Sequence, residues 1–289
     1  MIWSIVSKDE MEGYSIPPVF QYYREVIGKD NIRLAVVDRN DPLEFVERGD
    51  VVLLRTVDEN LIESIKRRGA STTAEKYSLY QQVWDKKTLA NFLSYYNVLV
   101  PKQYEENEVE EGKVYFVKPR FGSESFGITP SCICRSREDV AKQVQRIKDE
   151  LDEECVIEEF VDGVDCTTAC YYDPKERRIQ THSIMVECDE DGGIQTHVGK
   201  FSYNEYCSAL KGSVREDADY VSFKAFRLLG IKHHARIDYR LSNDGRLYLI
   251  DINLMPGLGP SAHFSKCLLL TDNLSYADSI NRIIESASR

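Results

Sequence analysis

The sequence lacks a long apolar run, an excess of basic residues and a strong leader pattern, and each absence excludes a class of protein. No stretch approaches the roughly 20 apolar residues that span a bilayer. The short apolar start, Met1–Lys8, has no basic segment before it, so it is interpreted as a first β-strand and not as a secretion signal. With a formal net charge of −11, no global positive field favours nucleic acid or an anionic membrane. Any site for an anionic ligand must therefore be local.

The sequence also has no C-x-x-C pair. Eight cysteines in a chain without a secretion signal are expected to be reduced thiols in the cytoplasm, and most are expected to be small buried hydrophobic residues. Their closest spacing, Cys132-x-Cys134, has no nearby histidine, and the five histidines are not spaced as a metal set. A structural zinc site is therefore not expected from the sequence.

A Gly-rich turn between strand and helix is missing from residues 1–84, which argues against a dinucleotide-binding unit there. Ile32–Asp38 and Val51–Thr56 are β-branched apolar runs of strand length, suited to burial on both faces of a sheet. A helix is predicted over Asp58–Lys66, because a capping residue and early acids open it, late bases follow, and Gly69 stops it. The segment is predicted to be a small α/β unit.

The rest of the chain has no internal repeats and no low-complexity tracts. Residues 178–212 are polar and are predicted to be irregular, with a loop tip at 189–193. The expected fold class is α/β with α+β subdomains, in three parts: residues 1–84, 85–160 and 161–289. Further helices are predicted at Asp85–Asn97, at Asp139–Leu151 after a capping-box pattern from Ser136, at Glu216–Leu229 and at Tyr276–Ala287.

The densest polar cluster is Val117–Ile128, where Lys118 ends an apolar strand and a loop of small residues returns into another strand. Glycines let the backbone approach a ligand closely, and exposed N–H groups with serine hydroxyls can bind phosphate oxygens. When the segment is considered alone, a simple hairpin loop rich in turn residues is the favoured interpretation.

A second cluster supports the phosphate interpretation. Ala235–Tyr239 and Leu249–Asn253 are predicted antiparallel strands, because Asn243-Asp244-Gly245 is a strong hairpin turn. The two-residue period of a strand places Arg236 and Asp238 on one face of the first strand. It places Asp251 and Asn253 on one face of the second strand in the same way. Three oxygen ligands on a face of otherwise apolar strands suit Mg²⁺. The alternative is a solvated face with an incidental ion pair of Arg236.

A third cluster lies in Val156–Asp165, where an apolar strand runs into two acids, an aromatic residue and a turn. Such a segment can hydrogen-bond an adenine edge through its backbone and a ribose diol through a carboxylate. A strand that simply ends in an acidic turn fits the spacing equally well.

In this order, the clusters resemble the ATP-grasp superfamily and, within it, the carboxylate–amine ligases similar to D-alanine–D-alanine ligase and to ribosomal S6 glutamate ligase. The resemblance covers Asp85 to Gly257, most of the chain. It implies an ATP-grasp fold preceded by a short N-terminal α/β domain. It also implies an ADP-forming ligase that joins a carboxylate to an amine through an acyl phosphate, with ATP and Mg²⁺ (or Mn²⁺ in its place) as cofactors and amino acids or a small peptide as substrates.

The resemblance also implies roles for individual residues around the nucleotide. Lys86 and Lys118 correspond to the two lysines that contact ATP phosphates. Ser123, Ser125 and Gly127 fall in the lid over the phosphates, and Ser125 and Lys118 are expected to act in catalysis. Glu158, Phe160 and Val161 correspond to the adenine-binding linker. Asp165 corresponds to the ribose-binding acid.

At the reacting end, the resemblance implies that Asp238, Asp251 and Asn253 are the metal ligands. Arg236 corresponds to the arginine that stabilises the acyl phosphate and the tetrahedral intermediate. Lys200 corresponds loosely to a lysine on the loop that closes over the site, although an exposed loop lysine also explains it. The turn before His263 borders the acceptor amino acid in relatives, which makes His263 and Ser261 further candidates for substrate contact.

Two departures from the pattern limit the resemblance. Most relatives have Glu where this chain has Asp251, which leaves the number of metals open, and the N-terminal motifs by which D-alanine–D-alanine ligases hold their first amino acid are absent. The sequence therefore does not specify D-alanine. The alternative function is an ATP-binding regulatory or scaffold protein that has the fold and no ligase activity. The expected partners are small molecules, with no nucleic acid and no membrane, in a monomer or homodimer.

Overall fold

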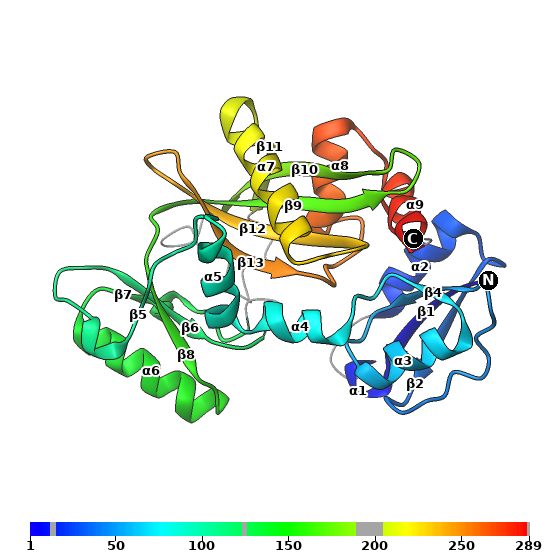
Figure 1. Ribbon diagram of the computed structural model, residues 1–289, viewed down its shortest axis with the longest axis horizontal. Helices are drawn as coiled ribbons and strands as arrows, with labels where there is room; N and C mark the ends of the chain where they lie inside the picture. The colour runs from blue at the N-terminus through cyan, green and yellow to red at the C-terminus, as the bar shows by residue number, and fades with distance from the viewer. Residues whose placement is uncertain (12–15, 123–125, 189–204, 288–289) are drawn as a thin grey trace.

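Three β-sheets organise the residues that the computed structural model describes, which are 1–11, 16–122, 126–188 and 205–287 (Figure 1). One sheet lies near the N-terminus, and the other two follow it in the sequence. No helix within these ranges has both the length and the apolar character that a membrane span requires.

The N-terminal sheet is parallel and has the strand order β2-β1-β3-β4. The predicted helix is confirmed as α3 (Glu59–Arg68): its N-cap Asp58 accepts a hydrogen bond from the Leu61 amide, and Gly69 ends it with a positive φ of 73°. The strands are β1 (Ile2–Ser7), β2 (Ile32–Val37), β3 (Val51–Leu54) and β4 (Ser71–Thr72), and α1 (Lys8–Met11) and α2 (Ile16–Ile27) complete the unit.

The second sheet has the order β5-β8-β6-β7 and is antiparallel in the described pairings. Helix α6 (Arg137–Leu151) packs on it, and Ser136 caps that helix as predicted. The strands are β5 (Gln103–Tyr104), β6 (Tyr115–Pro119), β7 (Ile133–Cys134) and β8 (Cys155–Glu159), with short 3₁₀ turns at Glu106–Glu108 and Pro130–Cys132.

The third sheet is antiparallel in the order β11-β10-β9-β12-β13. The predicted hairpin is confirmed, with Arg236 opposite Asn253 and Asp238 opposite Asp251. The prediction of an irregular stretch over residues 178–212 is wrong for two strands in it, β10 and β11; the loop tip at 189–193 lies outside the described residues. The strands are β9 (Gly163–Asp173), β10 (Arg178–Cys188), β11 (Glu205–Ala209), β12 (His234–Ser242) and β13 (Leu247–Asn253).

Helices cover both faces of the third sheet, and they differ in which strand residues they meet. Helix α7 (Gly212–Leu228) shares a core with Cys170 and Ile237, whereas α8 (His263–Asp272) shares one with Ala169. Because side chains alternate along a strand, the face with Ala169, Arg236 and Asp238 is the face of α8. The remaining helices are α4 (Tyr77–Trp84), α5 (Lys86–Tyr95) and α9 (Tyr276–Ser286).

The N-terminal unit is joined to the third sheet by both packing and a polar contact. One continuous core includes Ile5, Leu54 and Ile65 of the first unit together with Ile237 and Leu249 of the third sheet. Arg55, just after β3, donates a hydrogen bond to the Pro256 carbonyl at 2.8 Å. Helix α4 runs from the N-terminal unit toward α5, below the third sheet in the view of Figure 1. The loop after β13 is therefore positioned partly by the N-terminal unit.

Candidate functional site

A cavity of about 1060 Å³, including its open mouth, lies between the second and third sheets. Charged, polar and aromatic side chains line it, from both sheets and from the helices and loops next to them. They include Lys86, Phe116, Lys118, Phe126, Glu158, Phe160, Asp165, Thr167, Asp238, Arg240, Asp251 and His263.

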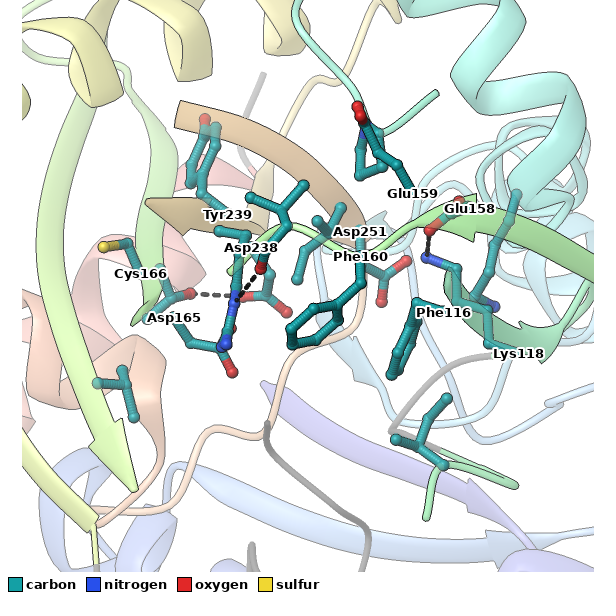
Figure 2. Close-up of a pocket in the computed structure, with 18 of the residues that line it drawn as sticks. Phe116, Lys118, Glu158, Glu159, Phe160, Asp165, Cys166, Asp238, Tyr239 and Asp251 are labelled. Carbon is teal, nitrogen blue, oxygen red and sulfur yellow. Dashed lines mark hydrogen bonds and ion pairs between the residues drawn. The ribbon is translucent and has the colours of Figure 1, made fainter. Parts of the chain in front are cut away.

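On the second sheet, a buried ion pair forms one wall of the cavity. The Lys118 ammonium lies 2.8 Å from a carboxylate oxygen of Glu158, and both side chains are less than a tenth exposed. Figure 2 shows the two side chains pointing toward each other. Gln103 donates to the other oxygen of Glu158 at 3.1 Å. Register explains the pairing, since Lys118 and Glu158 lie on the adjacent strands β6 and β8. The buried Lys118 cation is thus paired with a carboxylate that Gln103 in turn holds in place.

Lys86, the first residue of α5, also lines the cavity. Its ammonium donates a hydrogen bond to the Gly122 carbonyl at 2.7 Å, at the base of the predicted lid. Burial lowers the pKa of Lys86, and the charge of Lys118 lowers it further, whereas the carboxylate of Asp251 opposes the shift. Two lysines from different elements therefore face one space, where a polyanion is favoured.

On the third sheet, Asp238 is the centre of a hydrogen-bonded group. Arg236 donates to both of its carboxylate oxygens, at 2.9 and 2.8 Å. Thr167, its partner across the β9–β12 ladder, donates its hydroxyl at 2.6 Å. Burial lowers the pKa of the Arg236 guanidinium, but the carboxylate of Asp238 outweighs that effect and holds the pKa above its ordinary value. Arg236 is therefore a fixed cation beside Asp238.

The neighbouring residues test whether a divalent cation fits here. Asp251 lies directly opposite Asp238 in the ladder, and Asn253 lies two pairs further along, opposite Arg236. The side-chain oxygen of Asn253 accepts the Met255 amide at 2.8 Å, which fixes the rotamer and leaves its second lone pair available. The donor set is entirely oxygen, as Mg²⁺ requires. The residues present therefore fit Mg²⁺ or a similar hard cation.

At the other end of the cavity, Arg240 organises the segment after β8. It donates to the Asp165 carboxylate at 2.8 Å and to the Val161 carbonyl at 3.0 Å. Its guanidinium also lies 5.9 Å from the centre of the Phe160 ring. Figure 2 shows the rings of Phe116 and Phe160 between Asp165 and Lys118. The aromatic rings suit a flat heteroaromatic group, and the neighbouring carboxylate suits hydroxyl groups attached to it.

The structure brings most of the predicted residues to this cavity. Arg236 and Asn253 do not line it but lie beside residues that do, on the same hairpin. Gly127 lies between the lining residues Phe126 and Ile128. The predicted residues Ser123, Ser125 and Lys200 lie outside the described residues. Those on the cavity wall are Lys86, Lys118, Glu158, Phe160, Val161, Asp165, Asp238 and Asp251.

Several residues of the site are not marked by any motif in the sequence. Thr167 and Arg240 lie within strands, where a threonine is an ordinary strand former and an arginine an ordinary surface residue. Gln103 and Phe116 lie in short segments without a motif. The only available signal was alternation, since Asp165 and Thr167 share a strand face.

A family model described as "D-ala D-ala ligase C-terminus" matches residues 92–285 of the chain. The chain is 28% identical over 159 residues to a D-alanine–D-alanine ligase of Nitratidesulfovibrio vulgaris, which covers 52% of this chain and 48% of that protein. It is 23% identical over 251 residues to a D-alanine–D-alanine ligase of Bacillus cytotoxicus, covering 85% of this chain and 63% of that protein. The chain thus spans about half the length of the curated relatives it matches.

Solved structures agree on the fold along the whole chain. A D-alanine–D-alanine ligase from Bacillus anthracis, complexed with ATP, superposes with a TM-score of 0.74 at 17% identity, covering 100% of this chain and 97% of that one. The VanG D-Ala:D-Ser ligase from Enterococcus faecalis gives 0.75 at 13% identity, covering 99% and 98%. The chain therefore has the ATP-grasp fold and belongs to the D-alanine–D-alanine ligase C-terminal family.

Proposed function

We propose that this chain is an ATP-dependent ligase that activates a carboxylate as an acyl phosphate and joins it to an amine, with release of ADP and phosphate. The observation that carries the proposal is a convergence of charges. Lys86 and Lys118 from one side, and Asp238 and Asp251 from the other, line a single cavity. The phosphates of a metal-bound nucleoside triphosphate would bind the two lysines, and its metal ion would bind the two aspartates. A single ligand of this kind therefore fits both sides of the cavity.

In this proposal the chain's own residues divide the work by position. Phe116, Phe160 and the backbone of Val161 receive the base, and Asp165 receives the ribose. Lys86 and Lys118 bind and orient the phosphates, and positioning with electrostatic stabilisation supplies nearly all the catalysis of such transfers.

At the reacting end, Asp238, Asp251 and Asn253 would hold Mg²⁺, which supplies charge neutralisation at the transferring phosphoryl group. Arg236, fixed beside Asp238, stabilises the negative charge that develops when the amine attacks the carbonyl. Gly127 is proposed to lie in the lid that keeps water from the acyl phosphate. Residues 1–84, 85–160 and 161–289 are proposed as the three structural units.

The substrates are proposed to be amino acids or a small peptide. The relatives in the comparisons are named for D-alanine and D-serine, so these amino acids belong in any screen. The proposed place of action is the cytoplasm. The proposed use of ATP supports it, and so do the seven described cysteines, which are all free thiols.

The test is release of ADP and phosphate from ATP with pairs of D- and L-amino acids, with mass detection of the product. Ligase activity predicts ADP only when both an acid and an amine are present. Loss of one metal-binding carboxylate in Asp251→Asn should lower turnover by roughly 10²–10³. Asp244→Asn is the matched control, because Asp244 is an exposed carboxylate in the turn of the same hairpin, bonded to Arg246.

Two outcomes would contradict the proposal. Near-normal turnover in Asp251→Asn would remove the assignment of the metal-binding face. Tight ATP binding with no ADP release for any pair of amino acids would favour the alternative, an ATP-binding regulatory protein.

A further inference from the structure

A second group of ligand-type side chains lies beside the cavity, on β11 and α8. Glu205 and Cys207 share one face of β11, because they are two residues apart on a strand. His263 is the first residue of α8, the helix that packs on the same face of the sheet. One oxygen, one sulfur and one nitrogen of these three side chains all lie within 4.8 Å of one another.

The ligand atoms of the three side chains already lie close to one another. The His263 Nε2 atom lies 2.8 Å from a carboxylate oxygen of Glu205, and both side chains are only 11% exposed. Cys207 is half-buried. A tetrahedral ion with bonds of about 2.0–2.3 Å spaces its ligand atoms by about 3.5 Å. Small side-chain rotations are therefore enough to place the three atoms around an ion.

The charge of the group also favours a cation. Once a metal ion displaces the thiol proton, the carboxylate, the thiolate and a neutral imidazole would together carry two negative charges, which a divalent ion balances. Lys266, one turn further along α8, places its ammonium 3.8 Å from the same Glu205 oxygen and 3.8 Å from the Cys207 sulfur. A positive charge thus already occupies the position next to these ligand atoms.

We propose that Glu205, Cys207 and His263 form a binding site for Zn²⁺, separate from the magnesium site proposed on the β12–β13 hairpin. Sulfur and imidazole donors select zinc over Mg²⁺ or Ca²⁺, which take oxygen ligands. The hairpin residues offer only oxygens, so the two groups differ in the metal they prefer. No sequence motif marks this site, because Cys207 and His263 are 56 positions apart and that spacing matches no zinc motif.

The position of His263 gives this site a connection to the cavity. His263 is one of the cavity-lining residues, and Cys267 on the same helix contacts the carbonyl of Thr167, the residue that holds Asp238. Three protein ligands leave the fourth position of a tetrahedral zinc ion open, as in catalytic sites. That position would take water or a group of a molecule in the cavity. The proposal is independent of ligase activity and rests on the cluster alone.

The experiment uses the full chain, freed of metal and kept reduced, in a buffer with excess Mg²⁺ to occupy oxygen-only sites. Zn²⁺ is titrated in competition with a chromophoric chelator, and Co²⁺ is used as a spectroscopic substitute. The expected result is one ion per chain, with a thiolate-to-cobalt charge-transfer band. Cys207→Ser should remove the band and weaken Zn²⁺ binding about 100-fold or more, since loss of even an indirect partner costs roughly 10–100-fold.

Further variants separate the site from other thiols and from misfolding. His263→Gln should weaken binding while keeping the cobalt band, and Lys266→Met should tighten binding because it removes a competing cation. Cys155→Ser is the matched control, because Cys155 is also a half-buried free thiol, on β8. Thermal unfolding without metal checks that each variant is folded. Absence of the band in the unmodified chain, or equal affinity in Cys207→Ser, would overturn the proposal.

Discussion

The buried pair of Lys118 and Glu158 allows a test that separates stability from nucleotide binding. The two groups are 2.8 Å apart, and their side chains are 7% and 6% exposed. Glu158→Gln leaves the Lys118 ammonium without its carboxylate, and Lys118→Met does the converse. Removing one partner of a buried pair costs about 3–5 kcal/mol, because the remaining charge is uncompensated. Each single variant should therefore lose about that much free energy of unfolding.

The double variant should lose less than the sum of the two single variants, because it leaves no uncompensated charge. ATP gives a second comparison. If Lys118 binds a phosphate, ATP with Mg²⁺ should stabilise Glu158→Gln more than the unmodified chain, since the phosphate replaces the missing carboxylate. Urea unfolding followed by circular dichroism, with and without nucleotide, measures both effects.

An exposed pair on the same part of the chain provides the control. Lys113 and Glu110 lie 2.9 Å apart, with side chains 51% and 62% exposed. Lys113→Met should change the free energy of unfolding by no more than about 1 kcal/mol. Additive losses in the double variant of the buried pair would refute the coupling. Equal stabilisation by ATP in Glu158→Gln and in the unmodified chain would refute the phosphate contact of Lys118.

Three further predictions concern other parts of the fold. Burial lowers the pKa of His234 to about 3. Because the unfolded state takes up a proton below about pH 6.5, the free energy of unfolding should fall from pH 6.5 toward 3 by up to about 1.4 kcal/mol per pH unit. His234→Leu should flatten this slope in urea unfolding measured across that pH range. A Cβ at Gly163 would lie 1.9 Å from the Leu241 carbonyl oxygen, so Gly163→Ala should lower stability by about 3 kcal/mol or more in thermal unfolding, whereas Gly259→Ala, which meets nothing within 4 Å, should not. Thr167→Val removes the hydroxyl that holds Asp238 and should raise the Mg²⁺ concentration needed for ATP turnover about 10–100-fold, with the fold intact by circular dichroism.

The β12–β13 hairpin was predictable because several local signals agree there. The Asn-Asp-Gly turn fixes the connection, alternation fixes the face, and the polar residues stand out in apolar strands. The sequence alone therefore places Arg236 and Asp238 on one face. The α3 helix was predictable for the same reason, since its cap, its charges and Gly69 all indicate the same boundaries.

Strand β10 was not predictable, because its pattern depends on neighbours that are distant in the sequence. Ser183 is completely buried, yet it is polar; Thr168 on β9 shares a hydrogen bond with it, and it donates another to Asp219 on α7. His182 stacks on Tyr171, with ring centroids 5.7 Å apart. Polar residues in a buried strand look like a loop until their tertiary partners are known. The residue Thr167 was missed for a related reason, because its role depends on Asp238, 71 positions later in the chain.

The pairing of charges around the cavity has a consequence for how a nucleotide can bind. Lys118 is held by Glu158, Arg240 by Asp165 and Arg236 by Asp238. A phosphate that binds Lys118 must therefore compete with a carboxylate that is already in place, and a metal at Asp238 must share it with a guanidinium. A free anion or a free cation alone gains little from such an exchange, because each new contact weakens an existing one. A magnesium–nucleotide complex supplies both charges at once, so the paired arrangement itself favours that complex over simple phosphate or Mg²⁺.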